Sequence, residues 1–158
     1  MKTLNKEIGT LLPNKVIHFI TDGSWSLHEL LDYLLNQTGS ASVKIASFAL
    51  SEVAVRCFAR LIDEQKITAL DCLFDKSCRR TKFDLLTFCS SMANIRLTEN
   101  HMKLIIIKNE DWHIVVNTSA NFTPNKRAEA GIITTILEDY NQYNSNYDAL
   151  FSKAVIYE

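Results

Sequence analysis

The chain has 158 residues, of which 47% are hydrophobic and 22% are charged, and its formal net charge is −1. This composition is typical of a globular protein and excludes disordered and collagen-like chains, so we expect a single domain over residues 1–158. A near-neutral total also excludes an overall basic coat for nucleic acid, although it permits a local basic patch.

Targeting and metal-binding patterns are missing from the sequence. No stretch is apolar enough to suggest a membrane span, and residues 1–13 lack the long apolar core of a signal peptide. We therefore expect a cytoplasmic protein with reduced cysteines. None of the four cysteines has the CxxC spacing of a zinc site, so no metal and no cofactor are expected.

The first half of the chain alternates predicted strands with predicted helices. Short β-rich apolar runs predict the strands, and apolar side chains at helical spacing predict the helices. Ser26 and Glu29 have the spacing of a capping box at the start of the first helix, and Gly39 ends it. Strands are expected at 16–20, 42–50 and 67–74, and helices at 26–39 and 51–65.

The second half is predicted to add a hairpin to the same sheet. Thr81 and Asp84 are expected to cap a third helix that ends near residue 92. Two apolar runs around a short polar turn predict an antiparallel hairpin, which makes this α/β sheet mixed. The hairpin strands are expected at 101–107 and 112–117, further strands at 94–98 and 130–135, an N-terminal arm at 1–14 and a C-terminal helical tail at 137–158.

Four polar residues are expected to meet at the open end of this hairpin. His101 and Lys103 are two residues apart at the start of one strand, so their side chains share one face. Ser119 and Asn121 follow the end of the other strand. Because the open ends of two hairpin strands lie side by side, the sequence predicts one cluster with an imidazole, an ammonium, a hydroxyl and an amide.

This set of side chains suits the chemistry of phosphodiesters. A neutral imidazole can attack phosphorus or protonate a leaving oxygen. A lysine ammonium, together with serine and asparagine donors, can hold the non-bridging oxygens while negative charge builds on them. The chemistry requires no metal.

With these residues the sequence resembles the phospholipase D superfamily, whose signature is HxKxxxxDxxxxxxGSxN. His101-Met-Lys103 matches HxK, and Thr118-Ser-Ala-Asn121 stands in for GSxN. Thr118 therefore occupies the glycine position, where it is a supporting residue. The order of the expected strands and helices is also similar to the family over nearly the whole chain.

Two further positions belong to this resemblance. Asp111 matches the aspartate of the signature when counted back from Ser119, whereas counting forward from Lys103 reaches Lys108, so the hairpin turn is three residues longer than in the signature. We interpret Asp111 as a turn residue with a supporting role. Glu129 matches a downstream glutamate that supports the catalytic histidine in this family.

The resemblance implies an α/β/α sandwich, a mixed sheet with helices on both faces, and a metal-independent phosphodiesterase that works through a phosphohistidine. Family members use two facing copies of the motif, and this sequence has one, so a homodimer in which two copies of His101 meet is implied. Lys103, Ser119 and Asn121 would bind the phosphate, and Glu129 would orient an imidazole. Short single-copy members are typically endonucleases, which implies nucleic acid as the substrate.

Each of these residues also has a purely structural interpretation. His101 could be a hydrogen-bonded strand histidine, and Lys103 could be a charge that protects an edge strand. Ser119 and Asn121 could be turn residues that close a strand. Glu129 could simply pair with neighbouring basic residues. These interpretations stay open from the sequence alone.

Local basic residues offer a surface for nucleic acid, although they could equally form a solvated loop. Lysine and arginine position phosphates without reading bases, and the nearby Phe83 and Phe122 could stack unpaired bases. The absence of a lipidation motif disfavours a lipid substrate. The alternatives are a catalytically weak module that binds nucleic acid or a phosphorylated ligand, and a domain with a vestigial site. The basic residues are Lys76, Arg79, Arg80, Lys82, Lys126 and Arg127.

Overall fold

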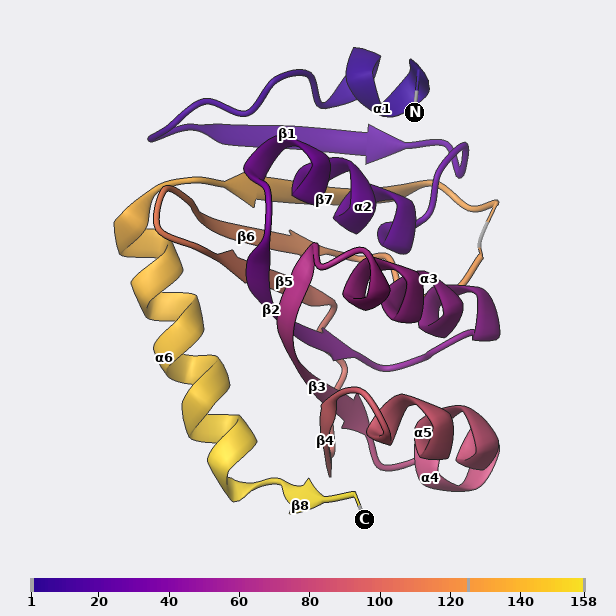
Figure 1. Cartoon of the computed structure of the whole chain (residues 1–158). Helices are drawn as coiled ribbons and strands as arrows, with labels where there is room; N and C mark the ends of the chain where they lie inside the picture. The colour runs from indigo at the N-terminus through magenta and orange to yellow at the C-terminus, as the bar shows by residue number, and fades with distance from the viewer. Residues whose placement is uncertain (1, 125, 158) are drawn as a thin grey trace.

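The computed structural model describes residues 2–124 and 126–157, and within them an eight-stranded sheet crosses the molecule (Figure 1). The strands lie in the order β1-β7-β6-β5-β2-β3-β4-β8. They are β1 (Val16–Thr21), β2 (Ala41–Ser47), β3 (Ile67–Asp75), β4 (Asn94–Thr98), β5 (Leu104–Lys108), β6 (His113–Thr118), β7 (Glu129–Thr134) and β8 (Val155–Ile156). Met1 and Glu158, the ends of the predicted domain, arm and tail, lie outside the described residues.

The sheet is mixed, as the sequence predicts. β2, β3 and β4 run parallel to one another, whereas all other neighbouring pairs of strands in the described sheet are antiparallel. The predicted hairpin is formed by β5 and β6, which pair Leu104 with Asn117 at the open end and Lys108 with His113 at the turn. β5 also pairs with β2 and so joins the antiparallel part of the sheet to the parallel part.

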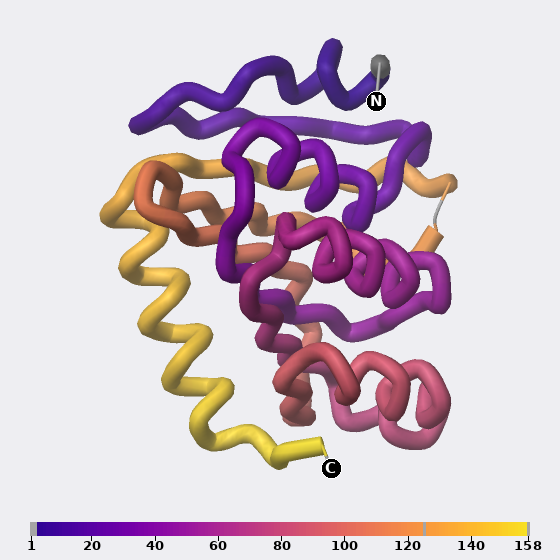
Figure 2. Tube along the Cα trace, in the orientation of Figure 1, coloured from indigo at the N-terminus to yellow at the C-terminus, as the bar shows by residue number. Residues whose placement is uncertain are grey.

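Helices cover both faces of the sheet, which confirms the layered arrangement (Figure 2). The larger core lies between the sheet and α1, α2, α3 and α5, whereas a smaller core lies under α6 on the opposite face. No helix in the described part of the chain is both long enough and apolar enough to cross a membrane. The helices are α1 (Lys2–Glu7), α2 (Leu27–Thr38), α3 (Glu52–Asp63), α4 (Cys78–Thr81), α5 (Phe83–Ser90) and α6 (Leu137–Lys153).

Local hydrogen bonds explain where α2 and α3 begin and end. The carboxylate of Glu29 accepts a hydrogen bond of 2.7 Å from the Ser26 amide, as expected for a capping box. Gly39 follows α2 with a φ of 78°, a conformation that favours glycine, and its amide donates to the Leu35 carbonyl. At the start of α3, the Ser51 hydroxyl accepts a hydrogen bond from the Ala54 amide.

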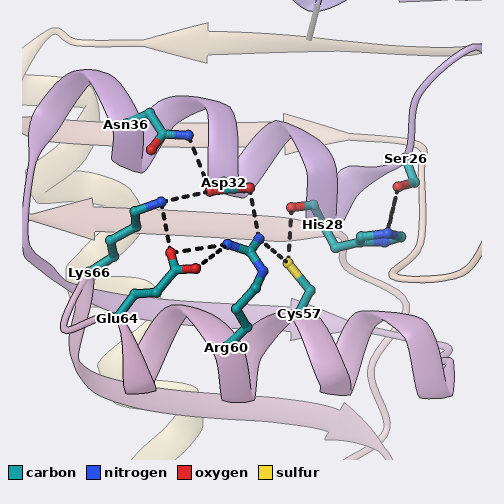
Figure 3. A network of polar contacts seen from close by, with 8 residues as sticks. All are labelled: Ser26, His28, Asp32, Asn36, Cys57, Arg60, Glu64 and Lys66. Carbon is teal, nitrogen blue, oxygen red and sulfur yellow. Dashed lines mark hydrogen bonds and ion pairs between the residues drawn. The ribbon is translucent and has the colours of Figure 1, made fainter.

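A polar network joins the outer surfaces of α2 and α3 (Figure 3). Asp32 on α2 accepts hydrogen bonds from Arg60 at 2.7 Å and from Lys66 at 3.4 Å. Both cations also contact Glu64, at 2.9 Å each. The network ties the solvent side of the two helices together, while their apolar faces pack on the sheet.

Several local expectations were wrong. The short elements α1 and β8 were not predicted, and the first hairpin strand begins at Leu104 rather than at residue 101. The predicted cap of the third helix does not form, because the Thr81 hydroxyl donates to the Ser77 carbonyl within α4 instead. The buried Phe122 is part of the larger core, so it is not available to stack on a base.

One edge of the sheet collects the loops that carry the candidate residues. The carboxyl ends of the parallel strands β2, β3 and β4 meet at this edge. The open end of the hairpin joins them there, because Leu104 of β5 pairs with Ala46 near the end of β2. We call this the site edge, and it consists of residues 47–51, 75–82, 99–103 and 119–129 without residue 125.

Candidate active site

A cavity of about 540 Å³ opens at the site edge, between the hairpin and α6. His101, Lys103 and Ser119 line it, so the structure brings together three of the four residues that the sequence placed at the open end of the hairpin. Asn117 and Tyr143 close the side next to α6, where the Asn117 amide donates a hydrogen bond of 2.8 Å to the Tyr143 hydroxyl.

The ammonium of Lys103 contacts both the imidazole and the backbone carbonyl of His101. Its Nζ lies 2.9 Å from His101 Nδ1 and also donates to the His101 carbonyl at 2.8 Å. An ammonium is only a donor, so the ring nitrogen that it contacts accepts the hydrogen bond. The same Nζ lies 3.4 Å from Nε2, so the ammonium contacts the ring at both nitrogens and fixes its position beside the cavity.

The environment of Lys103 makes it easier to deprotonate than an exposed lysine. Its residue is 8% exposed, and this burial lowers the pKa of Lys103. The negative charge of Glu129 acts in the opposite direction and raises the pKa, but by less than burial lowers it. Glu129 therefore lies close enough for its charge to act on Lys103, and its role in orienting an imidazole stays a prediction.

Ser119 connects Glu129 to the cavity. The Ser119 hydroxyl donates a short hydrogen bond to the Glu129 carboxylate and accepts one of 3.1 Å from the Ala130 amide. Thr118 is buried, and its hydroxyl bridges the Ala130 carbonyl and the Ala120 amide. These contacts fix the start of β7 against the end of β6.

Thr118 occupies the position where the family signature has glycine. Its neighbour across the strands, Gly131, has no side chain and so leaves space for Thr118. The two residues face each other across β6 and β7. A side chain at Gly131 would place its Cβ 2.8 Å from the Thr118 Cβ and 2.6 Å from the Asn117 carbonyl oxygen. An isolated glycine within a strand pattern indicates such a close approach, so Gly131 is the sequence signal for this contact.

Asn121 is oriented by the loop that follows β2. Its Oδ1 lies 3.2 Å from the Ala49 amide, which can only donate, and 3.3 Å from the Ser47 hydroxyl. The side-chain oxygen is therefore committed to this loop. The Nδ2 group remains as the donor, which is the part of an asparagine that can bind a phosphate oxygen.

Phe48 completes the surroundings of His101 and was not singled out from the sequence. Its ring centroid lies 5.0 Å from that of His101, with the two planes tilted by 48°. Phe48 is 39% exposed and Phe83 is 58% exposed, so both rings present surface to solvent at or next to the site edge. In the sequence Phe48 falls inside the strand predicted at 42–50, whereas β2 ends at Ser47 and leaves Phe48 in the following loop.

The six predicted basic residues all lie on loops or short helices of the site edge. Lys76, Arg79, Arg80 and Lys82 follow β3, and Lys126 with Arg127 precedes β7; each of the six is exposed. Lys76 lies 3.4 Å from the exposed Glu99 carboxylate. The Cys78 thiol contacts the Phe48 carbonyl at 3.4 Å, which brings this basic segment against the loop that bears Phe48.

Asp111 lies far from these residues along the hairpin. It is exposed in the turn between β5 and β6, and its amide donates to the Asn109 side chain at 3.0 Å. Asp111 is thus part of the turn, which fits its interpretation as a turn residue. Within the described residues, no group of three or more histidine, cysteine or acidic side chains is arranged to hold a metal ion.

Solved structures share this fold. Nuc, a phospholipase D family member from Salmonella typhimurium, superposes with a TM-score of 0.71 and 12% identity, covering 91% of this chain and 98% of Nuc. NucT from Helicobacter pylori gives a TM-score of 0.70 and 18% identity, covering 90% of this chain and all of NucT. A phosphatidylserine synthase from Haemophilus influenzae gives 0.62 and 15% identity, covering 92% of this chain but 41% of the synthase.

These similarities show that the chain has the phospholipase D fold, which confirms the predicted mixed sheet of an α/β/α sandwich. A search of protein-family models finds none that matches the sequence. A search of curated proteins likewise finds no match. The fold is shared by proteins with different activities, so the function depends on the side chains of the site.

Proposed function

We propose that the chain is a metal-independent phosphodiesterase, a nuclease that cleaves through a phosphohistidine at His101. The observation that carries this proposal is the arrangement of His101, Lys103 and Ser119 around one open cavity. An imidazole, a partly desolvated ammonium and a hydroxyl around a space of about 540 Å³ are the groups that phosphoryl transfer needs.

In the first step, the imidazole nitrogen of His101 attacks phosphorus. A P–N bond forms while the P–O bond to the leaving oxygen breaks, and a second histidine, present as an imidazolium, donates its proton to that oxygen and becomes neutral. In the second step, this second imidazole takes a proton from water, whose oxygen attacks phosphorus and displaces His101. Lys103 and the Nδ2 group of Asn121 hold the non-bridging oxygens in both steps.

In this proposal the second imidazole comes from another copy of the chain. The sequence has one HxK motif, and none of its other histidines, His18, His28 and His113, is followed two residues later by lysine. His101 is exposed at the site edge, so the partner subunit's His101 can approach it across a twofold axis. A homodimer is therefore part of the proposal.

Nucleic acid is the substrate that the surroundings of the site favour. Six exposed basic residues lie along the site edge, and Phe48 offers an aromatic ring beside His101. Lysine and arginine bind phosphates of any sequence, and an exposed ring can stack on an unpaired base. The competing activity is cleavage of a lipid phosphodiester. The cytoplasmic location expected from the sequence stays a prediction.

The test is hydrolysis in the presence of EDTA. Bis(p-nitrophenyl) phosphate reports phosphodiester chemistry, plasmid and single-stranded DNA report nuclease activity, and phosphatidylcholine vesicles report lipid hydrolysis. We expect wild type to cleave the first two kinds of substrate and His101→Ala to cleave neither. His113→Ala is the matched control, because its ring packs on Tyr140 with centroids 4.8 Å apart at the turn end of the hairpin.

Two results would overturn the proposal. Equal activity of wild type and His101→Ala would remove His101 from the chemistry. Salt-dependent DNA binding without any cleavage would instead select the alternative, a module with this fold that holds nucleic acid.

A further inference from the structure

Asn100 is a buried amide directly before the exposed His101. It is 5% exposed, and a buried amide is costly unless its polar atoms are hydrogen-bonded. Its Nδ2 donates to the Leu73 carbonyl at 2.9 Å and to the Ser47 carbonyl at 3.5 Å. Its Oδ1 accepts a hydrogen bond of 2.8 Å from the Met102 amide. The side chain of Asn100 thus binds the ends of β2 and β3 and also the backbone of Met102, the residue that follows His101.

The backbone before His101 is anchored as well. The Asn100 amide donates to Asp75 Oδ2 at 3.0 Å, and Asp75 Oδ1 accepts from the Ser77 amide. Burial works against ionisation of Asp75, but the hydrogen bonds from Ser77 and Asn100 together keep its pKa below the ordinary value. The residues on both sides of His101 are therefore fixed to the end of β3.

Ser47 connects this anchor to the second half of the site. Its carbonyl accepts from Asn100, while its hydroxyl lies 3.3 Å from Asn121 Oδ1. Ser47 itself is fully buried at the end of β2. The imidazole of His101 and the amide of Asn121 are thus both positioned relative to one residue of a rigid strand.

We propose that Asn100 is a positioning residue, which holds His101 at the correct place relative to Asn121 for attack on a bound phosphate. The proposal rests on the proposed function of His101. Asn100 does not touch the substrate. Its contribution is geometric, and a displacement of about 1 Å at a reacting group can cost on the order of 100-fold in rate.

The hairpin supplies a matched control in Asn109. Its Oδ1 accepts from the Asp111 and Trp112 amides at 3.0 and 2.8 Å, and its Nδ2 donates to two carbonyls, of Thr38 and Ser40. Asn109 therefore makes the same kind of contacts as Asn100. It does so at the turn end of the hairpin, away from the cavity.

The experiment compares Asn100→Ala with Asn109→Ala for stability and for hydrolysis of bis(p-nitrophenyl) phosphate. We expect both variants to shift the urea midpoint in the same direction. Only Asn100→Ala should lower kcat, by about 10- to 100-fold, with a much smaller change in KM. If kcat of the two variants agrees within about twofold, Asn100 is merely structural and the proposal fails. Should Asn100→Ala not fold, Asn100→Asp takes its place, because it has nearly the same volume and removes the Nδ2 donors.

A second measurement separates this proposal from the proposed function. The ¹⁵N signals of the His101 imidazole report its position and tautomer without any turnover. If wild type does not hydrolyse the substrate, the proposed function has failed. The signals then decide the positioning role, because a change in Asn100→Ala that is absent in Asn109→Ala supports it and unchanged signals overturn it.

Discussion

Lys103 places an ammonium in a largely buried position beside the exposed His101. Burial lowers the pKa of Lys103, and the charge of Glu129 offsets only part of this effect. Because the protonated form holds the phosphate in the proposed reaction, we expect turnover to fall on the alkaline side. The fall should begin below the pH range in which an exposed lysine loses its proton. A pH profile of bis(p-nitrophenyl) phosphate hydrolysis measures it.

Two variants of Lys103 serve as controls for this pH profile. Lys103→Gln removes the charge and should lower kcat/KM by roughly 100- to 1,000-fold at neutral pH. Lys103→Arg keeps a positive charge over the whole accessible range, so any turnover that remains should lose its alkaline fall. An alkaline fall that persists unchanged in Lys103→Arg would mean that another group is responsible.

At the level of single residues, the sequence indicates the proposed reacting side chains better than the side chains that position them. The sequence predicts that His101, Lys103, Ser119 and Asn121 meet, because a hairpin brings its open ends side by side, and the first three line the cavity. Asn100 and Phe48 carry no such pattern, because their contacts join segments that are distant in sequence: Asn100 contacts Leu73 of β3, and Phe48 contacts His101. The predicted base-stacking role of Phe122 was wrong, because the apolar ring is enclosed in the larger core.

At the scale of elements, α2 and α3 are joined by the network around Asp32 (Figure 3). Asp32 pairs with Arg60 and Lys66, and the Asp32 side chain is 25% exposed. Asp32→Asn would leave both cations without this carboxylate. We expect the free energy of unfolding to fall by about 1 kcal/mol, as for partly screened surface pairs that form a network. Urea unfolding at low ionic strength measures this loss.

Glu52→Gln provides the comparison for the network. Glu52 pairs with Arg56 on α3, but both side chains are more than 60% exposed, so solvent screens the pair strongly. This variant should cost about 0.5 kcal/mol or less. Added salt should reduce the difference between the two variants, because the Debye length falls to about 3 Å at 1 M salt. Equal losses in both variants would contradict a cooperative network.

For the whole molecule, the sequence predicted the kinds of elements and their order along the chain. Periodicity and caps are local signals, which is why α2 and α3 appear where expected and the hairpin has the predicted turn, although its first strand begins three residues later. The order of strands in the sheet depends on pairings between distant segments, such as β1 with β7 and β2 with β5. β8 has two residues and pairs only with β4 in the described sheet, so no periodic pattern could have indicated it.

The proposed homodimer can be tested with dimers that combine wild-type and variant subunits. Wild type and His101→Ala are mixed at equal concentration, unfolded in urea and refolded together, so that subunits combine at random. If each active site needs His101 from both subunits, only dimers with two wild-type chains turn over. Activity should then be about a quarter of that of an all-wild-type sample with the same total concentration of chain.

A linear dependence on the wild-type fraction would contradict the shared site, since independent chains would keep about half of the activity. Refolding wild type with His113→Ala controls for losses during the procedure, because this variant keeps the His101 imidazole and should give nearly full activity. Analytical ultracentrifugation at the assay concentration must also show a dimer. A strict monomer that still hydrolyses the substrate would mean that a single His101, with water or another group of the same chain, completes the reaction.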